Sequence, residues 1–176
     1  MMSMLALELS VGDGRLEVEQ GLEYMLDRLW RFALTQCGDS SLADDLVQAT
    51  CTRALERAEQ FQPGTRLDAW LFSILASIWR NMTRSMAVRR GQGLVQAAEA
   101  DLESPEADDE TRLHLRQVLE HISELPESQR SVILLVCVEG LTYAETAKTL
   151  QIPIGTVMSR LSTARKSLHA LKTSKN

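Results

Sequence analysis

Glycine, proline and aromatic residues are scarce in this chain of 176 residues. It contains nine glycines and four prolines, and aromatic side chains make up 5% of it. Residues that favour turns are therefore few. No long segment alternates apolar and polar residues, which is the period-two pattern of β-strands. The sequence therefore predicts an all-α protein.

Cysteine is also rare, and its spacing excludes two classes of small protein. The three cysteines, Cys37, Cys51 and Cys137, form no CxxC pair, and no histidine lies at metal-ligand spacing. This argues against a disulfide framework and against a zinc site. Cys51 and Cys137 lie on apolar stripes and are expected in the core. We expect no metal and no cofactor.

The motifs of several enzyme classes are missing as well. The sequence has no GxSxG nucleophile elbow, no GxxxxGK[ST] phosphate loop and no HExxH helix. Its three histidines lie alone on predicted helix faces. We therefore expect a protein that is not an enzyme.

Long apolar runs are absent, and the total charge is modest. No run approaches the roughly 18 residues of a membrane helix. The 24 acidic and 19 basic residues give a net charge of -5, which neither indicates nor excludes nucleic acid. The expectation is a soluble, cytoplasmic protein without membrane insertion.

The N-terminal half has the apolar spacing of three amphipathic helices. They are predicted over 17–37, from a capping signal at 39–41 to about residue 58, and over 67–86. Gly38 is expected to end the first helix. In the third helix, Trp70 lies on the main apolar stripe and is assigned to the core.

A change of composition separates this half from the rest. Residues 99–110 contain seven carboxylates, a proline and no base, so they cannot bury enough apolar surface to order themselves. We predict two small helical domains, 15–86 and 112–176, joined by a flexible acidic linker at 87–111. The linker carboxylates are expected to compete with phosphate for the basic C-terminal end in the free protein.

The C-terminal half predicts a helix-turn-helix. A helix is expected near 112–124, and the apolar run 132–138 is predicted as helix because Gly140 closes it like a C-cap. Thr142 and Glu145 form a capping box that opens a short helix with an inner face of Ala144, Ala147 and Leu150. After a turn at 151–153, a last helix runs over 154–171.

Charge marks the same end as a candidate for DNA binding. From Gly140 onward there are six basic residues and one acidic residue. Small or hydrogen-bonding side chains near the start of the last helix suit the major groove, and cations further along suit phosphates. The groove candidates are Gly155, Thr156, Ser159 and Arg160, and the phosphate candidates are Arg165 and Lys166. The plain alternative is two packed helices with a solvated basic face.

Several motifs together resemble one protein family. LPESQR at 125–130, GLTYAETA at 140–147 and IPIGTVMSRL at 152–161 are similar to the promoter-binding domain of extracytoplasmic-function sigma factors. ADDLVQAT at 43–50 and FQPGTRLDAWLFSI at 61–74 resemble the other conserved domain of that family. The resemblance covers about four fifths of the chain.

The resemblance implies roles for individual residues. A face on the second helix would dock on the clamp helices of the largest RNA polymerase subunit, although, without the resemblance, a solvated face is the better explanation. Its residues are Asp44, Asp45, Gln48 and Thr52. The loop 61–68 and the next helix would read the promoter's −10 element as single strand, using Phe61, Ser77, Trp79, Arg80, Asn81 and Arg84. In the C-terminal domain, Thr142 and Met158 would join the six residues above on the −35 element.

Four positions depart from what family members often contain. They are Ser77, Asn81, Gln151 and Met158. Each residue found there tolerates a helix or a turn, so the departures bear on base preference more than on the fold.

The resemblance predicts a sigma factor that binds core RNA polymerase, including its flap, and promoter DNA, with an anti-sigma factor as a further expected partner. The alternative is a self-sufficient helix-turn-helix regulator whose N-terminal half senses a signal or dimerises. That alternative predicts tight duplex binding by the free chain. A protein-binding adaptor would leave the basic C-terminal helix without a role.

Overall fold

The computed structural model describes residues 2–90, 121–122 and 124–174. Every regular element in this described part is a helix, which confirms the all-α prediction. Two compact units are distinguished, one from residues 1–33 and 44–95 and one from 34–43 and 96–176. The predicted linker at 87–111 lies almost wholly outside the described residues, as does most of the helix predicted near 112–124.

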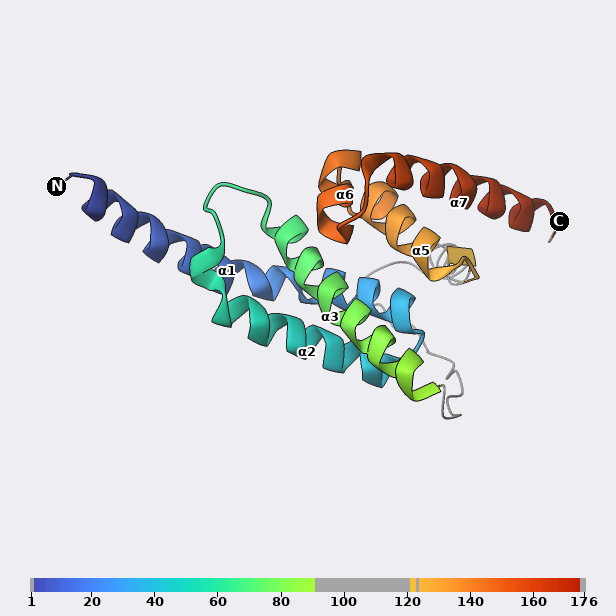
Figure 1. Ribbon diagram of the computed structural model, residues 1–176, viewed down its shortest axis with the longest axis horizontal. Coiled ribbons are helices and arrows are strands. Elements are labelled where there is room, and N and C mark those ends of the chain that lie inside the picture. Colours follow the sequence, from blue (N-terminus) through green and yellow to red (C-terminus); the bar gives the residue numbers. More distant parts are fainter. Residues whose placement is uncertain (1, 91–120, 123, 175–176) are drawn as a thin grey trace, which may run out of the picture. The chain divides into compact units, whose positions relative to one another are not determined.

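The N-terminal unit contains most of three helices, α1 (Met2–Cys37), α2 (Ser40–Glu56) and α3 (Leu67–Arg90), which Figure 1 shows packed side by side. A short 3-10 turn, Ala58–Gln60, follows α2. Helix α1 begins at Met2 rather than near Glu17, because the preceding residues are mostly strong helix formers. The first helix is therefore longer than predicted, and all three predicted helices are confirmed.

Local signals place the helix ends. Gly38 and Gly140 have φ angles of 70° and 68°, the left-handed conformation that glycine adopts without steric cost at helix ends. At the start of α2, the Asp39 carboxylate accepts a 2.8 Å hydrogen bond from the Leu42 amide. Asp39 therefore caps α2, as the sequence predicted.

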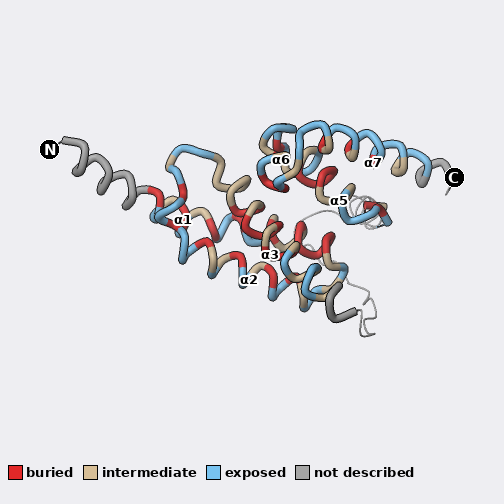
Figure 2. Tube along the Cα trace, viewed as in Figure 1, coloured by how far each residue is buried: buried red, intermediate tan, exposed pale blue. Residues whose placement is uncertain are grey.

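The core of the N-terminal unit lies along the facing stripes of its helices, red in Figure 2. Its centre is an aromatic pair, Phe32 and Phe72, with ring centroids 5.2 Å apart and exposures of 2% and 0%. Buried leucines from all three helices surround the pair: Leu29, Leu46, Leu71 and Leu75. Leu26 and Leu55 belong to the apolar spacing of α1 and α2 but are 42% and 43% exposed, because they lie at the edges of the buried stripes.

The C-terminal unit contains α5 (Glu127–Ile133), α6 (Tyr143–Leu150) and α7 (Ile154–Ser174), and α7 packs on both of the others. Its fully buried side chains include Val132, Leu135, Val157, Leu161 and Ala164. The prediction that the apolar run 132–138 is helical is confirmed. Its last five residues, Leu134–Val138, form a π-helical segment that the sequence did not predict.

The π-helical segment changes which residues of that run face inward. The Glu139 amide donates to the Leu134 carbonyl at 2.9 Å, and the Leu141 amide donates to the Leu135 carbonyl at 2.9 Å. The wider turn keeps Leu134 and Leu135 buried and leaves Val138 55% exposed. Cys137 is exposed too, so its assignment to the core is wrong. Cys51 is half-buried, and burial raises the pKa of its thiol.

Helix α6 turns a different face inward from the one predicted. Its buried residues are Thr146, Thr149 and Leu150, whereas Ala144 is exposed and Ala147 half-buried. The three buried positions have the i, i+3, i+4 spacing of a helix face. The prediction that Ala144 faces inward is wrong, because Thr146 and Thr149 occupy the buried side of α6 together with Leu150.

The turn between α6 and α7 places a non-glycine residue in a left-handed conformation. Gln151 has φ 54° and ψ 48° and is exposed. The Ile152 amide donates to the Ala147 carbonyl at 3.0 Å, which is the long hydrogen bond of a Schellman motif. A left-handed residue with a Cβ atom costs about 1 to 2 kcal/mol.

We therefore expect Gln151→Gly to raise the free energy of unfolding of the C-terminal unit. The gain should be about 0.5 to 1 kcal/mol, because glycine removes the strain but costs more entropy on folding. Urea unfolding measures it. Gln151→Ala is the control and should not stabilise, since alanine keeps the Cβ atom. An equal gain from alanine would show that the strain is not the cause.

Candidate functional site: polymerase and promoter interfaces

Helix α2 presents a polar face opposite its buried stripe. Ala43, Leu46, Thr50 and Ala54 are buried, and the Thr50 hydroxyl donates to the Leu46 carbonyl at 2.7 Å. The predicted polymerase residues lie on the other side and are all exposed: Asp44, Asp45, Gln48 and Thr52. Their exposure follows from the helical period, because they fall between the buried positions.

The side chains of two of these four residues are hydrogen-bonded within the N-terminal unit. The Trp30 indole nitrogen donates to the Asp44 carboxylate at 2.8 Å, and the Thr52 hydroxyl donates to the Gln48 carbonyl at 2.9 Å. Sequence reasoning missed Trp30. The sequence carries no signal for this contact, because the half-burial of Trp30 follows from the packing of α1 on α2. Asp45 and the Gln48 amide are thus the groups of this face best placed to meet a partner.

The loop before α3 holds its aromatic residue inward. Phe61 is only 3% exposed, and its ring centroid lies 5.3 Å from that of Trp70. Trp70 is half-buried rather than in the core. The sequence predicted Trp70 in the core and Phe61 at the DNA, but in the structure Phe61 is buried and Trp70 is partly exposed. In this conformation Phe61 has no face open for a stacked base.

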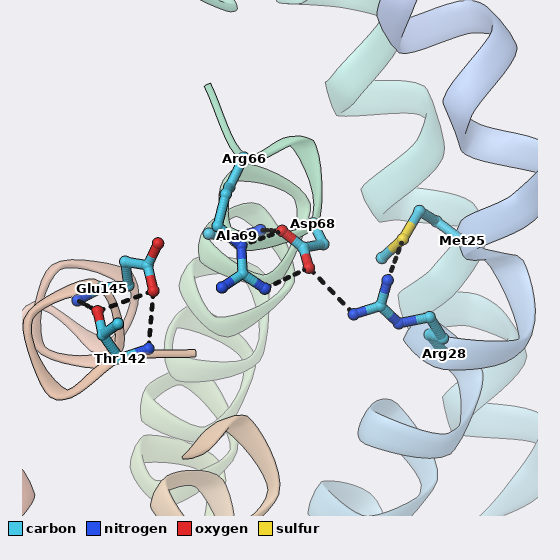
Figure 3. Close-up of polar contacts among 7 residues, drawn as sticks. All are labelled: Met25, Arg28, Arg66, Asp68, Ala69, Thr142 and Glu145. Atoms are coloured by element: carbon cyan, nitrogen blue, oxygen red, sulfur yellow. Dashed lines mark hydrogen bonds and ion pairs between the residues drawn. The ribbon is translucent and has the colours of Figure 1, made fainter. Parts of the chain in front are cut away.

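The first turn of α3 is anchored by a partly buried carboxylate, drawn in Figure 3. Asp68 accepts hydrogen bonds from Arg66 at 2.7 Å, from Arg28 at 3.1 Å and from the Ala69 amide at 2.8 Å. Its side chain is 16% exposed. Burial alone would raise the pKa of Asp68, but the hydrogen bonds from Arg66, Ala69 and Arg28 outweigh it and lower the pKa. Arg28 joins α1 to α3 through this carboxylate.

We expect Asp68→Asn to reduce the stability of the N-terminal unit at pH 7 by about 1.5 to 3 kcal/mol, because it weakens charged hydrogen bonds. The folded pKa lies below the unfolded value near 4, so the stabilisation is present above that value. It is lost as pH falls through the folded pKa. Urea unfolding at pH 7 and pH 3 should show the difference between wild type and variant shrinking at pH 3.

Asp45→Asn provides the control for this experiment, because that carboxylate is exposed. It should change stability by less than about 0.5 kcal/mol at either pH. A pH-independent gap for Asp68→Asn would contradict the role given to its charge.

The remaining −10 candidates lie along α3 with different exposures. Asn81 and Arg84 are exposed, Ser77 and Arg80 are half-buried, and Trp79 is only 8% exposed. Arg80 donates from Nε to the Ala76 carbonyl at 3.3 Å. The aromatic face expected from Trp79 is therefore covered, because this indole is buried.

A shallow hollow adjoins Asn81. It has a volume of about 380 Å³ and is lined by Arg53, Ile78, Asn81, Met82, Ser85 and Met86. A polar amide and an arginine meet apolar side chains there. The sequence did not predict it, since Arg53 comes from α2.

In the C-terminal unit, the predicted capping box is present and is drawn in Figure 3. The Glu145 amide donates to the Thr142 hydroxyl at 3.2 Å, and the Thr142 amide donates to the Glu145 carboxylate at 2.7 Å. The Thr142 hydroxyl also donates to this carboxylate at 2.8 Å. The amide and the hydroxyl of Thr142 are both hydrogen-bonded to Glu145 at the start of α6. A role in helix capping is therefore sufficient to explain why threonine occurs at this position.

Helix α7 exposes a continuous face on its first turns. Gly155, Met158, Ser159 and Lys166 are exposed, whereas Thr156 and Arg160 are half-buried at its edges. Sequence reasoning missed Ser162 and Thr163, which are exposed on the same side. Their positions one turn beyond Met158 and Ser159 would have indicated them.

Arg165 is exposed on the Met158 side of this face, seven residues further along α7. Contact with the side chains of Cys137 and Tyr143 raises the pKa of the Arg165 guanidinium. Arg165 is exposed and contacts both Cys137, at the end of the π-helical segment, and Tyr143, the first residue of α6.

Comparisons with known proteins agree with this arrangement in both units. The family model "Sigma-70 region 2" matches residues 22–89, and "Sigma-70, region 4" matches residues 115–168. The chain is 34% identical over 140 residues to "ECF RNA polymerase sigma factor EcfG" of Rhodopseudomonas palustris, covering 80% of this chain and 76% of the relative. The chain belongs to the ECF RNA polymerase sigma factors.

Other relatives and solved structures extend this result. "ECF RNA polymerase sigma factor SigC" of Mycobacterium tuberculosis is 30% identical over 170 residues, covering 94% of this chain and 88% of the relative. The sigma factor RpoE of Bartonella quintana, solved in complex with the anti-sigma factor NepR, matches with a TM-score of 0.76 and 29% identity. It covers 90% of this chain and 98% of that one.

As an ECF sigma factor, the protein binds core RNA polymerase and directs promoter recognition and transcription initiation. Sigma-70 regions 2 and 4 occur in the order that the motifs predicted. The alternative of a self-sufficient helix-turn-helix regulator is not favoured. Among the described residues, no helix is long and apolar enough to cross a membrane.

Proposed function

We propose that the polar face of α2 is the polymerase-binding surface of this sigma factor, with Asp44, Asp45, Gln48 and Thr52 toward the clamp helices of the largest subunit. The observation that supports it is the exposure of all four residues on one side of a helix whose other side is buried. A merely solvated face has the same exposure, so the proposal depends on a binding experiment.

For the −10 element, we infer that single-stranded DNA follows the exposed part of α3. Asn81 and Arg84 offer an amide for hydrogen bonding and a cation for phosphate, and Ser77 and Arg80 flank them. Phe61 and Trp79 are buried, so their rings would contact DNA bases only after a rearrangement on binding that exposes them. Trp70 is the aromatic side chain whose partial exposure makes it the better stacking candidate.

For the −35 element, we infer that α7 enters the major groove. Gly155, Thr156, Met158, Ser159 and Arg160 would lie toward base edges, while Lys166 and Arg165 would bind phosphates. The net positive charge from Gly140 onward supports this placement. Thr142 would act indirectly, by fixing the start of α6.

An anti-sigma factor is a further proposed partner. The solved RpoE relative is in complex with NepR, and a second solved relative, CnrH, is in complex with the cytosolic domain of CnrY. By analogy, a protein that covers the α2 face would block polymerase binding. We further propose that the factor acts in the cytoplasm and catalyses no reaction itself, because RNA synthesis belongs to the polymerase.

The test of the proposed function is in vitro transcription with purified core polymerase on a genomic promoter library. The factor should direct initiation at a defined promoter set, and the free chain should bind duplex DNA weakly. Tight, specific duplex binding by a dimer of the free chain, with no polymerase-dependent initiation, would support the regulator instead.

The −35 proposal predicts different effects for two cations of α7. In the holoenzyme, Arg160→Ala should weaken binding to the −35 element by about 1 to 3 kcal/mol and leave random DNA almost unaffected. Lys166→Ala should weaken all sequences alike and reduce the salt slope by about one. Binding titrations at several salt concentrations measure both effects.

Arg15→Ala is the control, because it removes one exposed charge from α1. It should change neither the affinity nor the slope. Equal losses on specific and random DNA for Arg160→Ala would exclude this residue from base readout.

A further inference from the structure

The first turns of α7 expose two large apolar side chains on a helix that already buries its own inner face. Ile154 is 49% exposed and Met158 54% exposed, whereas Val157 and Leu161 are 0% and 2% exposed. Ile154 and Met158 are four residues apart, so they are neighbours on the helix surface. This outer side of α7 is pale blue in Figure 2. The core of the unit therefore does not account for this pair.

The surroundings of the pair allow a partner to approach closely. Gly155 lies beside it, and a Cβ atom placed there would meet nothing within 4 Å. Two nearby hydroxyl hydrogens are used within the helix, since Ser159 donates to the Thr156 carbonyl at 3.1 Å and Thr163 donates to the Ser159 carbonyl at 3.0 Å. These two hydroxyls thus offer acceptor oxygens to a partner, beside the apolar contact of the pair.

Charge indicates what the partner is. The segment from Gly140 to the end has six basic residues and one acidic residue. A second copy of the chain would bring the same positive charge against it, which opposes dimerisation through this face. Duplex DNA supplies the opposite charge, and its major groove admits an α-helix.

Within the major groove, one group on the standard bases suits an apolar side chain. Thymine presents a C5-methyl there, whereas guanine presents two acceptors that arginine or lysine reads. We propose that Met158, with Ile154 beside it, reads a thymine C5-methyl in the −35 element. The inference rests on the proposed function of α7 and adds a preference for a T·A pair at one position.

The test removes this methyl group and nothing else. The −35 element selected by the holoenzyme is synthesised with each thymine in turn replaced by deoxyuridine, and holoenzyme binding is measured on every duplex. At one position we expect a loss of about threefold to fivefold for the wild type, as for one buried methyl group. With Met158→Ala, the loss at this position should disappear.

Lys166→Ala is the matched control on the same helix, since it should bind all duplexes more weakly but keep its sensitivity to deoxyuridine. Met158→Lys adds a gain of preference, because an ammonium group in place of the thioether should favour G·C over T·A at this position. Met158 is exposed, so neither Met158→Ala nor Met158→Lys should change the melting temperature appreciably.

The outcomes separate this inference from the proposed function. If no deoxyuridine substitution weakens the wild type while Lys166→Ala weakens every duplex, α7 binds DNA but the thymine contact is wrong. If Lys166→Ala also has no effect, the −35 proposal itself fails. A loss of affinity of Met158→Ala for core polymerase without DNA, or a dimer that this variant dissociates, would overturn the inference in favour of a protein partner.

Discussion

Replacing Asp45 and Gln48 by lysine is expected to abolish binding to core RNA polymerase. Binding should weaken at least about 100-fold, because two central contacts of an interface are lost and like charges are introduced if the partner surface is basic. Both residues are exposed opposite the buried stripe of α2, so the free energy of unfolding should fall by less than about 1 kcal/mol. Anisotropy titrations with labelled factor measure the affinity, and thermal unfolding measures the stability.

A matched control is available on α1. Gln20 and Asp27 have the same side chains, are exposed and lie seven residues apart, so Gln20→Lys with Asp27→Lys makes an equal change of charge. This double variant should bind polymerase like the wild type. Retained binding by the α2 variant would remove this face from the interface. A large drop in its melting temperature would show that the face is needed for folding.

Phe72→Ala is expected to have the largest effect on stability. Phe72 is fully buried against Phe32, and Arg28 lies 5.8 Å from the centroid of its ring. Truncation of a buried phenylalanine costs about 3 to 5 kcal/mol, which is comparable with the whole stability of many small domains. The N-terminal unit should therefore unfold at low urea concentration or be unfolded without it, and polymerase binding should be lost.

The chain provides a probe that reports on this unit alone. Its three tryptophans, Trp30, Trp70 and Trp79, all lie in the N-terminal unit. Tryptophan fluorescence should therefore show the loss for Phe72→Ala, while circular dichroism should retain a separate transition from α5, α6 and α7. Phe72→Leu is the control and should cost less than about 2 kcal/mol. A single transition by both probes would contradict the proposed division into independently folding domains.

Effects on polymerase binding and on folding are hardest to separate at Asp44. This residue is exposed, yet it accepts a hydrogen bond from Trp30 on α1. A substitution there removes an internal contact as well as a surface charge. Asp45 and Gln48 therefore test the interface more cleanly than Asp44 does.

Local interactions let the sequence alone predict the helices and most of their ends. The Thr142–Glu145 capping box, the Asp39 cap and the glycines at 38 and 140 each involve residues within a few positions of one another. Such contacts form whatever the rest of the chain does, so the local pattern is sufficient. The polar face of α2 was predictable for the same reason, because it follows from helical periodicity.

Tertiary packing decided which side chains at the candidate sites are open to a partner. Phe61 is covered by Trp70, nine positions along the chain, Asp44 meets Trp30 across fourteen, and Arg28 meets Asp68 across forty. The inward turn of Thr146 and Thr149 and the π-helical segment at 134–138 depend on how α5 and α6 pack on α7. A periodic pattern defines the faces of a helix, but only the neighbouring helices determine how far each flank of a face is covered.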